Sequence, residues 1–434
     1  MPRRPERAPP DTGPSASVDA SATHRVARSA TMTAESERPA PVMEGFPPPP
    51  QWQVTPENMI RLPWLRWLQT HPWSRRPSAP VWRGPGPATP MARSDRPLGA
   101  IAVELAPWGR CDLDAYLQRS HADALLVLHR GRIVHETYLH GMAPQHRHAI
   151  ASATKSLFGL IVSDLVETGV LDAGSAASRW VPELEGTPLG EATIDQLLDM
   201  RASFRFTDET HQIGTLQESV LQALGMRPRP RDYAGPDGVY ALLRSARSAG
   251  PHGGAFRYDN GCTDTLGWVV RRATGRSLVD LVSERVWQPI GAEEDAGFAL
   301  DTTLVEWAAA GLSATLRDLG RFGEMVRNRG VVGGRELFAP AVFDDLARGG
   351  DRAAFAASVS EAGLPGGTYR RHWWCRHDRW GGIAAHGQFA QEVYVAPLAE
   401  VVIVQLSSDP DTTAAVRPLR MAVFDAICAR LAGG

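Results

Sequence analysis

The segment Ser152-Ala153-Thr154-Lys155 contains the only lysine of this 434-residue chain. The other 45 of its 46 Lys and Arg residues are arginines. Arginine stays protonated at any working pH, whereas a buried lysine amine can lose its proton and act as a base. A position that keeps lysine in a chain that otherwise uses arginine is therefore expected to need a neutral amine.

The apolar residues that follow predict a helix that begins at Ser152 and ends at Gly169. A serine and a lysine at positions i and i+3 share one face of such a helix. The serine at the first turn lies near unpaired backbone N–H groups and the positive end of the helix dipole. An amine held beside that hydroxyl, away from water, has a lowered pKa and can accept the serine proton. Ser152 and Lys155 are thus a candidate nucleophile and base, although a solvated surface pair would have the same spacing.

Tyr258-Asp259-Asn260 is the only Tyr-x-Asn sequence among the seven tyrosines. A tyrosine near a lysine ammonium can be partly phenolate and relay protons to a leaving group, and an asparagine amide can hold the lysine or a substrate carbonyl. The alternative is a core tyrosine followed by a turn.

A third motif, His386-Gly387-Gln388, directly precedes the last two predicted strands. Small residues on an edge strand let a substrate carbonyl approach backbone N–H groups. One such N–H group, together with that of Ser152, would form an oxyanion hole.

The strands are expected at both ends of the chain and the helices mostly between them. The sequence predicts a hairpin with strands at 124–128 and 133–138, a mostly helical stretch at about 171–320, strands at 392–396 and 400–407, and a final helix at 413–431. This order predicts an α+β fold in which one antiparallel sheet is built from both ends of the chain and the helical middle is an inserted subdomain.

Residues 1–50 are rich in Pro, Ala, Ser, Arg and Glu. A segment so poor in large apolar residues cannot bury enough surface to offset its ordering, so we expect it to be disordered. The remaining residues, 51–434, are expected to form the folded domain. Its first part, up to about residue 93, carries five tryptophans among prolines and is interpreted as an irregular arm whose aromatic rings are buried on the core.

The three motifs, in this order, resemble those of the serine β-lactamase and penicillin-recognising family. Within it they resemble the class C β-lactamase-related branch, which includes family VIII carboxylesterases and 6-aminohexanoate-dimer hydrolases. The resemblance extends from about Trp52 to the C-terminus. It implies an antiparallel sheet flanked by helices, Ser152 as the acylated nucleophile, Lys155 as its base partner and Tyr258 as a second proton shuttle.

The chain departs from the family pattern at His386, which stands where β-lactamases and D,D-peptidases carry the lysine of Lys-Thr-Gly. That lysine helps to hold the carboxylate of β-lactams and peptide termini, so its replacement favours the esterase and amide-hydrolase branch. We therefore expect a serine hydrolase that cleaves a small ester or linear amide through an acyl-enzyme, with no metal and no organic cofactor. The alternatives are a β-lactamase or D,D-peptidase, or a non-catalytic module that binds a ligand of the same kind.

Three other possible sites are weaker. His135-Glu136-Thr137-Tyr138-Leu139-His140 has one residue too many for a zinc-protease signature and lies on a predicted strand, where its histidines point to opposite faces. His146 and His148 are expected to be structural or solvated. The helical middle also contains Asp208, Glu209 and His211, where an acidic side chain could meet a substrate amine, but solvated charge is the default interpretation. Gly-x-Ser-x-Gly is absent, so an α/β-hydrolase nucleophile is not indicated.

The composition limits the partners. A formal net charge of −2 gives no reason to expect nucleic acid or an anionic membrane as a partner. The longest apolar stretch is broken by polar residues, and the N-terminus lacks the apolar core of a secretory signal. The four widely spaced cysteines are expected to be reduced thiols, which predicts a cytoplasmic protein. The expected partner is a small-molecule substrate. The sequence does not indicate the oligomeric state.

Overall fold

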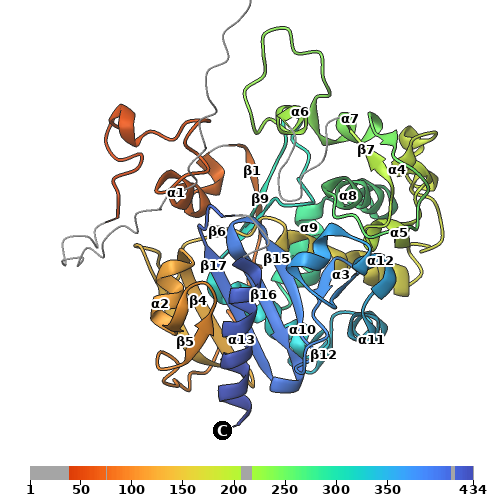
Figure 1. Ribbon diagram of the computed structural model, residues 1–434. Coiled ribbons are helices and arrows are strands. Elements are labelled where there is room, and N and C mark those ends of the chain that lie inside the picture. Colours follow the sequence, from red (N-terminus) through yellow and green to blue (C-terminus); the bar gives the residue numbers. More distant parts are fainter. Residues whose placement is uncertain (1–38, 75, 207–217, 412–415, 434) are drawn as a thin grey trace, which may run out of the picture. The chain divides into compact units, whose positions relative to one another are not determined.

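The structure is a computed structural model that describes residues 39–434, apart from Arg75, residues 207–217 and 412–415, and Gly434 (Figure 1). Most of the segment 1–50, for which we expected disorder, lies outside the described residues. Its last part, residues 39–50, forms turns in which Val42 is buried, and the N–H of Met43 donates to the carbonyl of Trp52 at 3.0 Å.

A seven-stranded sheet organises the fold, and all its neighbouring strands are antiparallel. Two of its strands come from the early hairpin and five from the last quarter of the chain, so the predicted sheet built from both ends of the chain is confirmed. In spatial order the strands are β13 (Thr368–Arg370), β14 (Trp373–Cys375), β15 (Ile383–Gly387), β16 (Gln391–Ala396), β17 (Val401–Ser407), β4 (Ala122–His129) and β5 (Arg132–Tyr138).

Helices cover both faces of this sheet (Figure 1). Side chains alternate between faces along a strand, and two neighbouring residues of β16 contact different helices. Val393 lies against Gly323 of α10 (Leu316–Arg327), where an added Cβ would be 3.2 Å from Val393 Cγ1. The ring of Tyr394 lies 5.8 Å, between centroids, from that of Phe424 on α13 (Val416–Ala432). The predicted α+β fold, an antiparallel sheet flanked by helices, is therefore confirmed.

A second sheet joins the N-terminal arm to the middle of the chain. Its strands, in spatial order, are β1 (Ser78–Val81), β9 (Ala296–Ala299), β10 (Leu312–Ala314) and β6 (His148–Ala149). Strands β9 and β10 lie within the stretch 171–320 that we predicted to be mostly helical. They are short and almost entirely buried, so the polar–apolar alternation that identifies a strand is missing from their sequences.

The remaining strands form three two-stranded ladders: β2 (Ala102–Leu105) with β3 (Gly109–Asp112), β7 (Phe204–Arg205) with β8 (Arg247–Ser248), and β11 (Val331–Val332) with β12 (Arg335–Glu336). The other α-helices are α1 (Trp64–Thr70), α2 (Leu113–Arg119), α3 (Ala153–Glu167), α4 (Pro188–Glu191), α5 (Ile194–Leu198), α6 (Glu218–Ala223), α7 (Gly238–Arg244), α8 (Asn260–Thr274), α9 (Leu278–Val282), α11 (Pro340–Arg348) and α12 (Arg352–Ala356). Single turns of 3₁₀ or π-helix occur at Pro50–Trp52, Pro72–Ser74, Ala177–Arg179, Pro182–Leu184, Ser283–Trp287, Val359–Gly363, Gln388–Ala390 and Pro397–Ala399.

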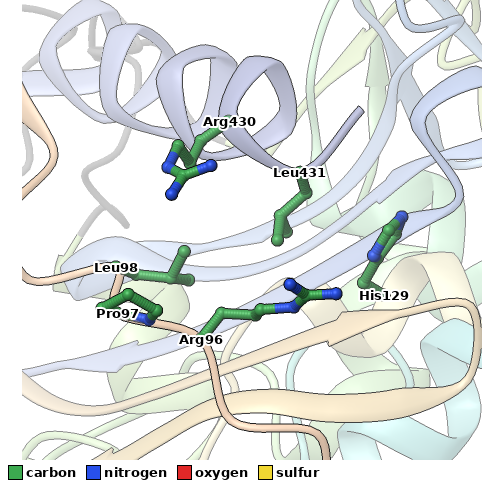
Figure 2. A pocket seen from close by; sticks show the side chains of 6 residues that line it. All are labelled: Arg96, Pro97, Leu98, His129, Arg430 and Leu431. Carbon is green, nitrogen blue, oxygen red and sulfur yellow. The ribbon is translucent and has the colours of Figure 1, made fainter. Parts of the chain in front are cut away.

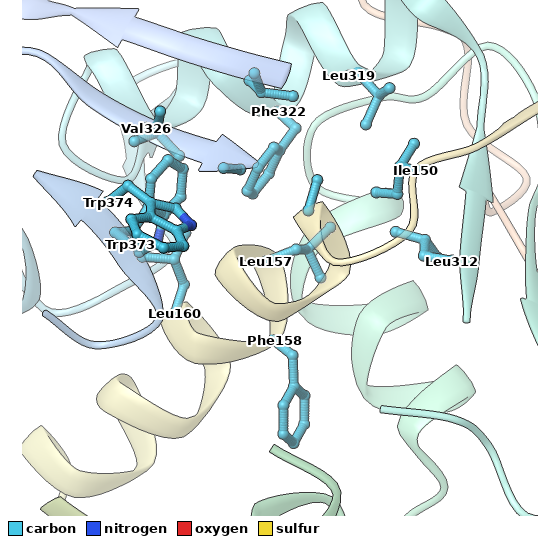
Figure 3. Packing of buried hydrophobic residues seen from close by; sticks show 14 of the residues in the cluster. Ile150, Leu157, Phe158, Leu160, Leu312, Leu319, Phe322, Val326, Trp373 and Trp374 are labelled. Atoms are coloured by element: carbon cyan, nitrogen blue, oxygen red, sulfur yellow. The ribbon is translucent and has the colours of Figure 1, made fainter. Parts of the chain in front are cut away.

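Helix α3 is the buried centre of the molecule, with every residue from Ala153 to Leu165 buried. Its apolar side chains pack among those of α10 and β14 (Figure 3). The turn before β14 approaches α3 so closely that a Cβ on Gly159 would be 2.5 Å from the carbonyl oxygen of Arg371. The hydroxyl of Ser156 donates to the carbonyl of His372 in the same turn, at 2.6 Å. The helix that carries Ser152 is thus fixed on several sides.

The arm before the hairpin is more regular and less buried than expected. It contains α1 and strand β1, which pairs with β9. Trp73 and Trp82 remain 46% and 52% exposed, so the prediction that the aromatic rings of the arm are buried was wrong for these two.

Candidate active site

Ser152 is the residue immediately before α3, and its side chain is half-buried and open to solvent. The preceding residue, Ala151, has φ of 46°, in the left-handed region that alanine rarely adopts. The carbonyl of Ala151 accepts a hydrogen bond from the hydroxyl of Thr154 at 2.7 Å, and this bond holds the turn. The chain is therefore held in a strained conformation at the residue beside the candidate nucleophile, as is common at functional sites.

Lys155 is fully buried, and its amine contacts three oxygen atoms. Nζ lies 2.9 Å from Ser152 Oγ, 2.7 Å from Asn260 Oδ1 and 2.8 Å from the carbonyl oxygen of Ala309. Asn260 Oδ1 and the Ala309 carbonyl can only accept hydrogen bonds. In a neutral amine these two acceptors take both N–H groups, so the lone pair is left facing the hydroxyl of Ser152. The geometry fits a base that accepts the proton of that hydroxyl.

Burial lowers the pKa of the Lys155 amine, because the charged form loses its hydration. The carboxylates of Asp264 and Asp259 oppose this shift, but among the described residues no carboxylate forms an ion pair with Nζ. The three contacting groups are uncharged. The surroundings of Lys155 therefore favour its neutral form far below the pH at which an ordinary lysine loses its proton.

Tyr258 lies beside this pair, with its ring centroid 5.0 Å from Lys155 Nζ. Burial raises the pKa of its hydroxyl to about 12, against the opposing effects of a hydrogen bond with Ser152 and the charge of Arg417. This direction favours the neutral phenol over the partly ionised form that we expected, because the burial that disfavours charge on Lys155 disfavours it on Tyr258 as well. The phenol is suited to donate a proton rather than to take the first one from Ser152.

Asn260 is brought to Lys155 by the start of helix α8. The side chain of Asp259 caps this helix by accepting from the N–H of Gly261 at 2.9 Å. Asn260 is the first helical residue and points to Lys155. Asp and Asn suit the cap and the turn before a helix, which explains why the Tyr-x-Asn motif stands there.

Sequence analysis missed two residues of this network. Asp264, one helical turn after Asn260, is buried, and its Oδ1 accepts from the N–H of Ala309 at 2.9 Å. Burial raises the pKa of its carboxyl. Asp264 thereby fixes Ala309, whose carbonyl contacts Lys155. The i, i+4 spacing from Asn260 is a signal that could have identified Asp264, but nothing in the sequence marks Ala309.

The end of β15 lies against the turn that carries Ser152. A Cβ on Gly387 would be 2.2 Å from the carbonyl oxygen of Ile150 and 3.2 Å from the backbone nitrogen of Ala153, so only glycine fits at this position. The next residue, Gln388, is exposed. The predicted juxtaposition of this strand end and the candidate nucleophile is thus present in the structure.

His386 does not join the Ser152 and Lys155 cluster. Its Nδ1 lies 3.1 Å from Glu392 Oε2 and 3.1 Å from Arg420 Nη2. Burial lowers the pKa of its imidazole to about 3, and the charges of Arg417 and Arg420 act in the same direction. The imidazole is therefore neutral near neutral pH and does not supply the positive charge of the lysine that it replaces.

The other candidates lie apart from this cluster. A pocket near the C-terminal end of α13 contains none of the predicted site residues; it is lined by Arg96, Pro97, Leu98, His129, Arg430 and Leu431 (Figure 2). His148 is fully buried against Asp123. Asp208, Glu209 and His211 lie outside the described residues. In the described part of the chain no group of His, Cys, Asp and Glu could hold a metal ion, and the cysteines are unpaired.

Comparison with known proteins identifies the family of the chain. A model of the beta-lactamase family matches residues 113–426, well over half of the chain. The chain belongs to the beta-lactamase family. The resemblance that the motifs indicated is thus confirmed, and the matched region holds all the predicted site residues.

Relatives within and around this family include hydrolases. A 6-aminohexanoate-dimer hydrolase of Paenarthrobacter ureafaciens is 33% identical over 370 residues, which cover 85% of this chain and 90% of that protein. A solved candidate 6-aminohexanoate-dimer hydrolase of Bacillus anthracis has a TM-score of 0.81 at 30% identity, over 87% of this chain and 98% of its own. A solved family VIII carboxylesterase shares the fold, with a TM-score of 0.53 at 16% identity over 71% and 92% of the two chains. These relatives support hydrolase activity in general for the chain.

None of the helices in the described residues is both long and apolar enough to span a bilayer.

Proposed function

We propose that the chain is a serine hydrolase that cleaves a small ester or linear amide through an acyl-enzyme on Ser152. The observation that carries this proposal is the surroundings of the Lys155 amine, with two fixed acceptors for its N–H groups and the Ser152 hydroxyl on the third side. The similarity to 6-aminohexanoate-dimer hydrolases supports a linear amide among the substrates.

The steps follow from the residues. Neutral Lys155 takes the proton of Ser152 as Oγ attacks the substrate carbonyl and forms a tetrahedral intermediate. The backbone N–H of Ser152 and a second N–H at the end of β15, at residue 388 or 389, stabilise the oxyanion. Tyr258 donates its proton to the leaving group and recovers one from Lys155. Water then attacks the acyl-enzyme, and the same groups return the proton to Ser152.

The experiment begins with three substrates: p-nitrophenyl acetate, the linear 6-aminohexanoate dimer and a chromogenic cephalosporin. Ser152→Ala should abolish turnover, and intact-mass spectrometry should find one acetyl group on wild type after p-nitrophenyl acetate and none on the variant. Ser163→Ala is the matched control, because its hydroxyl lies on the same helix without a hydrogen-bond partner among the described residues. Substantial turnover by Ser152→Ala would remove Ser152 as the nucleophile, and cephalosporin turnover alone would point to a β-lactamase.

Lys155→Arg tests the base in the same assays. Arginine keeps the charge but cannot become a neutral base, so we expect a loss of about 10²- to 10⁴-fold in kcat/KM, the range typical of a general base. Thermal unfolding of the variant shows whether the fold persists. A folded Lys155→Arg variant with wild-type rates would contradict the role of a neutral amine.

A further inference from the structure

Asp264 is a carboxylate that is connected to the Lys155 amine through a single residue of backbone. Its side chain is buried, and its Oδ1 accepts from the N–H of Ala309 at 2.9 Å. The carbonyl of Ala309 accepts in turn from Lys155 Nζ at 2.8 Å. Asn260, one helical turn earlier on α8, contacts Nζ directly, and residues spaced i, i+4 share one face of a helix. Helix α8 therefore presents both an amide and a carboxylate to the surroundings of Lys155.

The hydrogen bond to Ala309 does not by itself explain a carboxylate at this position. An asparagine oxygen would accept from the same N–H, and a buried carboxylate loses its hydration unless a cation compensates it. In the described part of the chain no arginine or histidine forms an ion pair with Asp264. Burial raises the pKa of its carboxyl, and the largest opposing effect of a charge comes from Lys155. The relation is mutual, since burial lowers the pKa of the Lys155 amine and Asp264 opposes this most.

The other titratable groups around the Lys155 amine add little charge. Asp259, which caps α8, acts in the same direction as Asp264 but to a smaller extent. Burial raises the pKa of the Cys262 thiol and that of the Tyr258 hydroxyl. Burial lowers the pKa of the imidazole in the turn before β14, at residue 372, to about 3. These last three groups are therefore uncharged near neutral pH, and the negative charge near the amine comes from α8 and its cap.

We infer that Asp264 is a positioning residue that acts through Lys155. Its carboxylate holds the Ala309 carbonyl against the amine and stabilises the ammonium that forms when the amine takes the Ser152 proton. The proton moves from Oγ to Nζ, and Asp264 neither gains nor loses one. The three neutral contacts of Nζ do not stabilise the ammonium, and a buried amine without a nearby negative charge is a weaker base. The kinetic part of this inference rests on the proposed function, whereas the effect of Asp264 on the charge of the amine does not.

The first test uses the fact that Lys155 is the only lysine of the chain. Isotope-labelled lysine therefore gives the NMR signals of a single side chain, and their chemical shift against pH measures the pKa of this amine. Asp264→Asn keeps an oxygen for the Ala309 N–H but removes the charge. Loss of a negative charge disfavours the ammonium, so the pKa of Lys155 should fall by about one to two units. An unchanged or higher pKa would overturn the inference.

The pH profile of kcat/KM for p-nitrophenyl acetate is the second readout. The neutral amine exists above its pKa, so the acid limb of Asp264→Asn should move to lower pH, as the NMR titration does. Above the limb, the rate should fall about 3- to 10-fold, because a weaker base removes the Ser152 proton less readily. A merely structural role would lower the rate without moving either the limb or the NMR titration, and would overturn the inference. If wild type hydrolyses none of the substrates, the proposed function fails, and the NMR titration still decides the inference.

Asp301→Asn is the matched control. Asp301 is also a buried carboxylate that accepts from backbone N–H groups, those of Val239, Thr303 and Val305 at 2.6, 2.7 and 3.0 Å. It is not among the charges that act on Lys155. Both readouts should therefore stay at their wild-type values in this variant, and a shift as large as that of Asp264→Asn would overturn the inference.

Lys155→Met covers the case in which Asp264→Asn does not fold. Because the two charges act on each other equally, loss of the cation should raise the pKa of the Asp264 carboxyl. The infrared difference spectrum of this variant against wild type at neutral pH should then contain the C=O band of a newly protonated carboxyl. The absence of this band in a folded Lys155→Met variant would overturn the inference.

Discussion

The amine of Lys155 connects three separate parts of the chain through single atoms: the Ser152 hydroxyl, the Asn260 amide and the Ala309 carbonyl. None of these partners is charged. This arrangement satisfies the hydrogen bonds of the amine without stabilising the ammonium, which is what a buried lysine needs in order to act as a base. The identity of each partner is therefore part of the chemistry, and replacing a neutral partner by a charged one should move the pH dependence of the reaction.

Asn260→Asp makes this argument testable. A carboxylate 2.7 Å from Nζ would favour the ammonium and raise the pKa of Lys155 by about one to three units. The neutral amine exists above its pKa, so activity falls as pH decreases through that value. In wild type the lowered pKa places this acid limb of kcat/KM well below the 10.5 of an ordinary lysine. In the variant the limb should move to higher pH, with lower activity at neutral pH.

The measurement is the pH profile of kcat/KM for p-nitrophenyl acetate. Asn260→Ala is the control, because it removes the same amide without adding charge and should not move the limb upward. An unchanged limb in a folded, active Asn260→Asp variant would mean that Lys155 is not the group that titrates.

At the level of single residues, the sequence indicated the pair Ser152 and Lys155, and Tyr258 and Asn260, which the structure brings around one amine. Lysine, tyrosine and asparagine are infrequent in this chain, and all four residues stand in short motifs, so each motif shows in the sequence. Ala309 could not be found in this way, because the chain has many alanines and only folding places its carbonyl beside Lys155.

Among the secondary-structure elements, strand β15 holds the candidate oxyanion site against the nucleophile turn. Gly387→Ala should disturb this contact, because the added Cβ would be 2.2 Å from the Ile150 carbonyl oxygen and neither backbone can move freely. A displacement of about 1 Å at a reacting centre can cost about 100-fold in rate. We therefore expect a fall of about that size in kcat and a lower unfolding temperature.

Turnover of p-nitrophenyl acetate and thermal unfolding measure the two effects. Gly86→Ala is the control, since nothing lies within 4 Å of its added Cβ and its φ is not in the left-handed region. Wild-type kcat in Gly387→Ala would show that β15 can shift away from the Ser152 turn with no loss of activity, and that its end does not bind the oxyanion.

Long elements were predicted better than short ones. The hairpin β4–β5 and the helix α3 match the predicted ranges within a few residues, because each carries an apolar pattern of several repeats. Strands β10 and β14 have three residues each, all buried, and so lack the alternation that would reveal them. They form because the long-range pairing of the sheets supplies their partners.

On the scale of the whole molecule, one buried carboxylate joins the two sheets and the N-terminal arm. Asp123, on β4, accepts from Arg66 of α1 at 2.6 Å and lies 3.1 Å from Nε2 of His148 on β6, while Ser408, beyond β17, donates to it. The order of elements along the chain does not reveal this junction, because the four residues are up to 342 positions apart. The predicted two-ended sheet therefore described the main layer but not what attaches the arm and the second sheet to it.

Asp123→Asn tests this junction. Breaking a buried ion pair by removing one partner typically costs about 3–5 kcal/mol in the free energy of unfolding, so a clearly lower unfolding temperature is expected at pH 7. Although burial alone would raise the pKa of the Asp123 carboxyl, His148, Arg66 and Ser408 lower it below its usual value of 3.8. An acid with a lowered pKa in the folded state stabilises the fold above its unfolded-state pKa and loses this effect as pH falls through the folded-state value. The difference in unfolding free energy between Asp123→Asn and wild type should therefore become smaller below about pH 4.

The control for this prediction is Asp172→Asn, which removes an exposed carboxylate 3.3 Å from Arg179 and should change stability by less than about 1 kcal/mol at either pH. A loss of stability in Asp123→Asn, relative to wild type, that is equally large at pH 3 and pH 7 would mean that the asparagine disturbs packing rather than charge. A loss of stability that disappears in acid would assign the stabilisation to the ionised carboxylate.

His148, which Asp123 holds, lies four residues before Ser152. In that case the charge that attaches the arm would also fix the strand that leads to the candidate nucleophile.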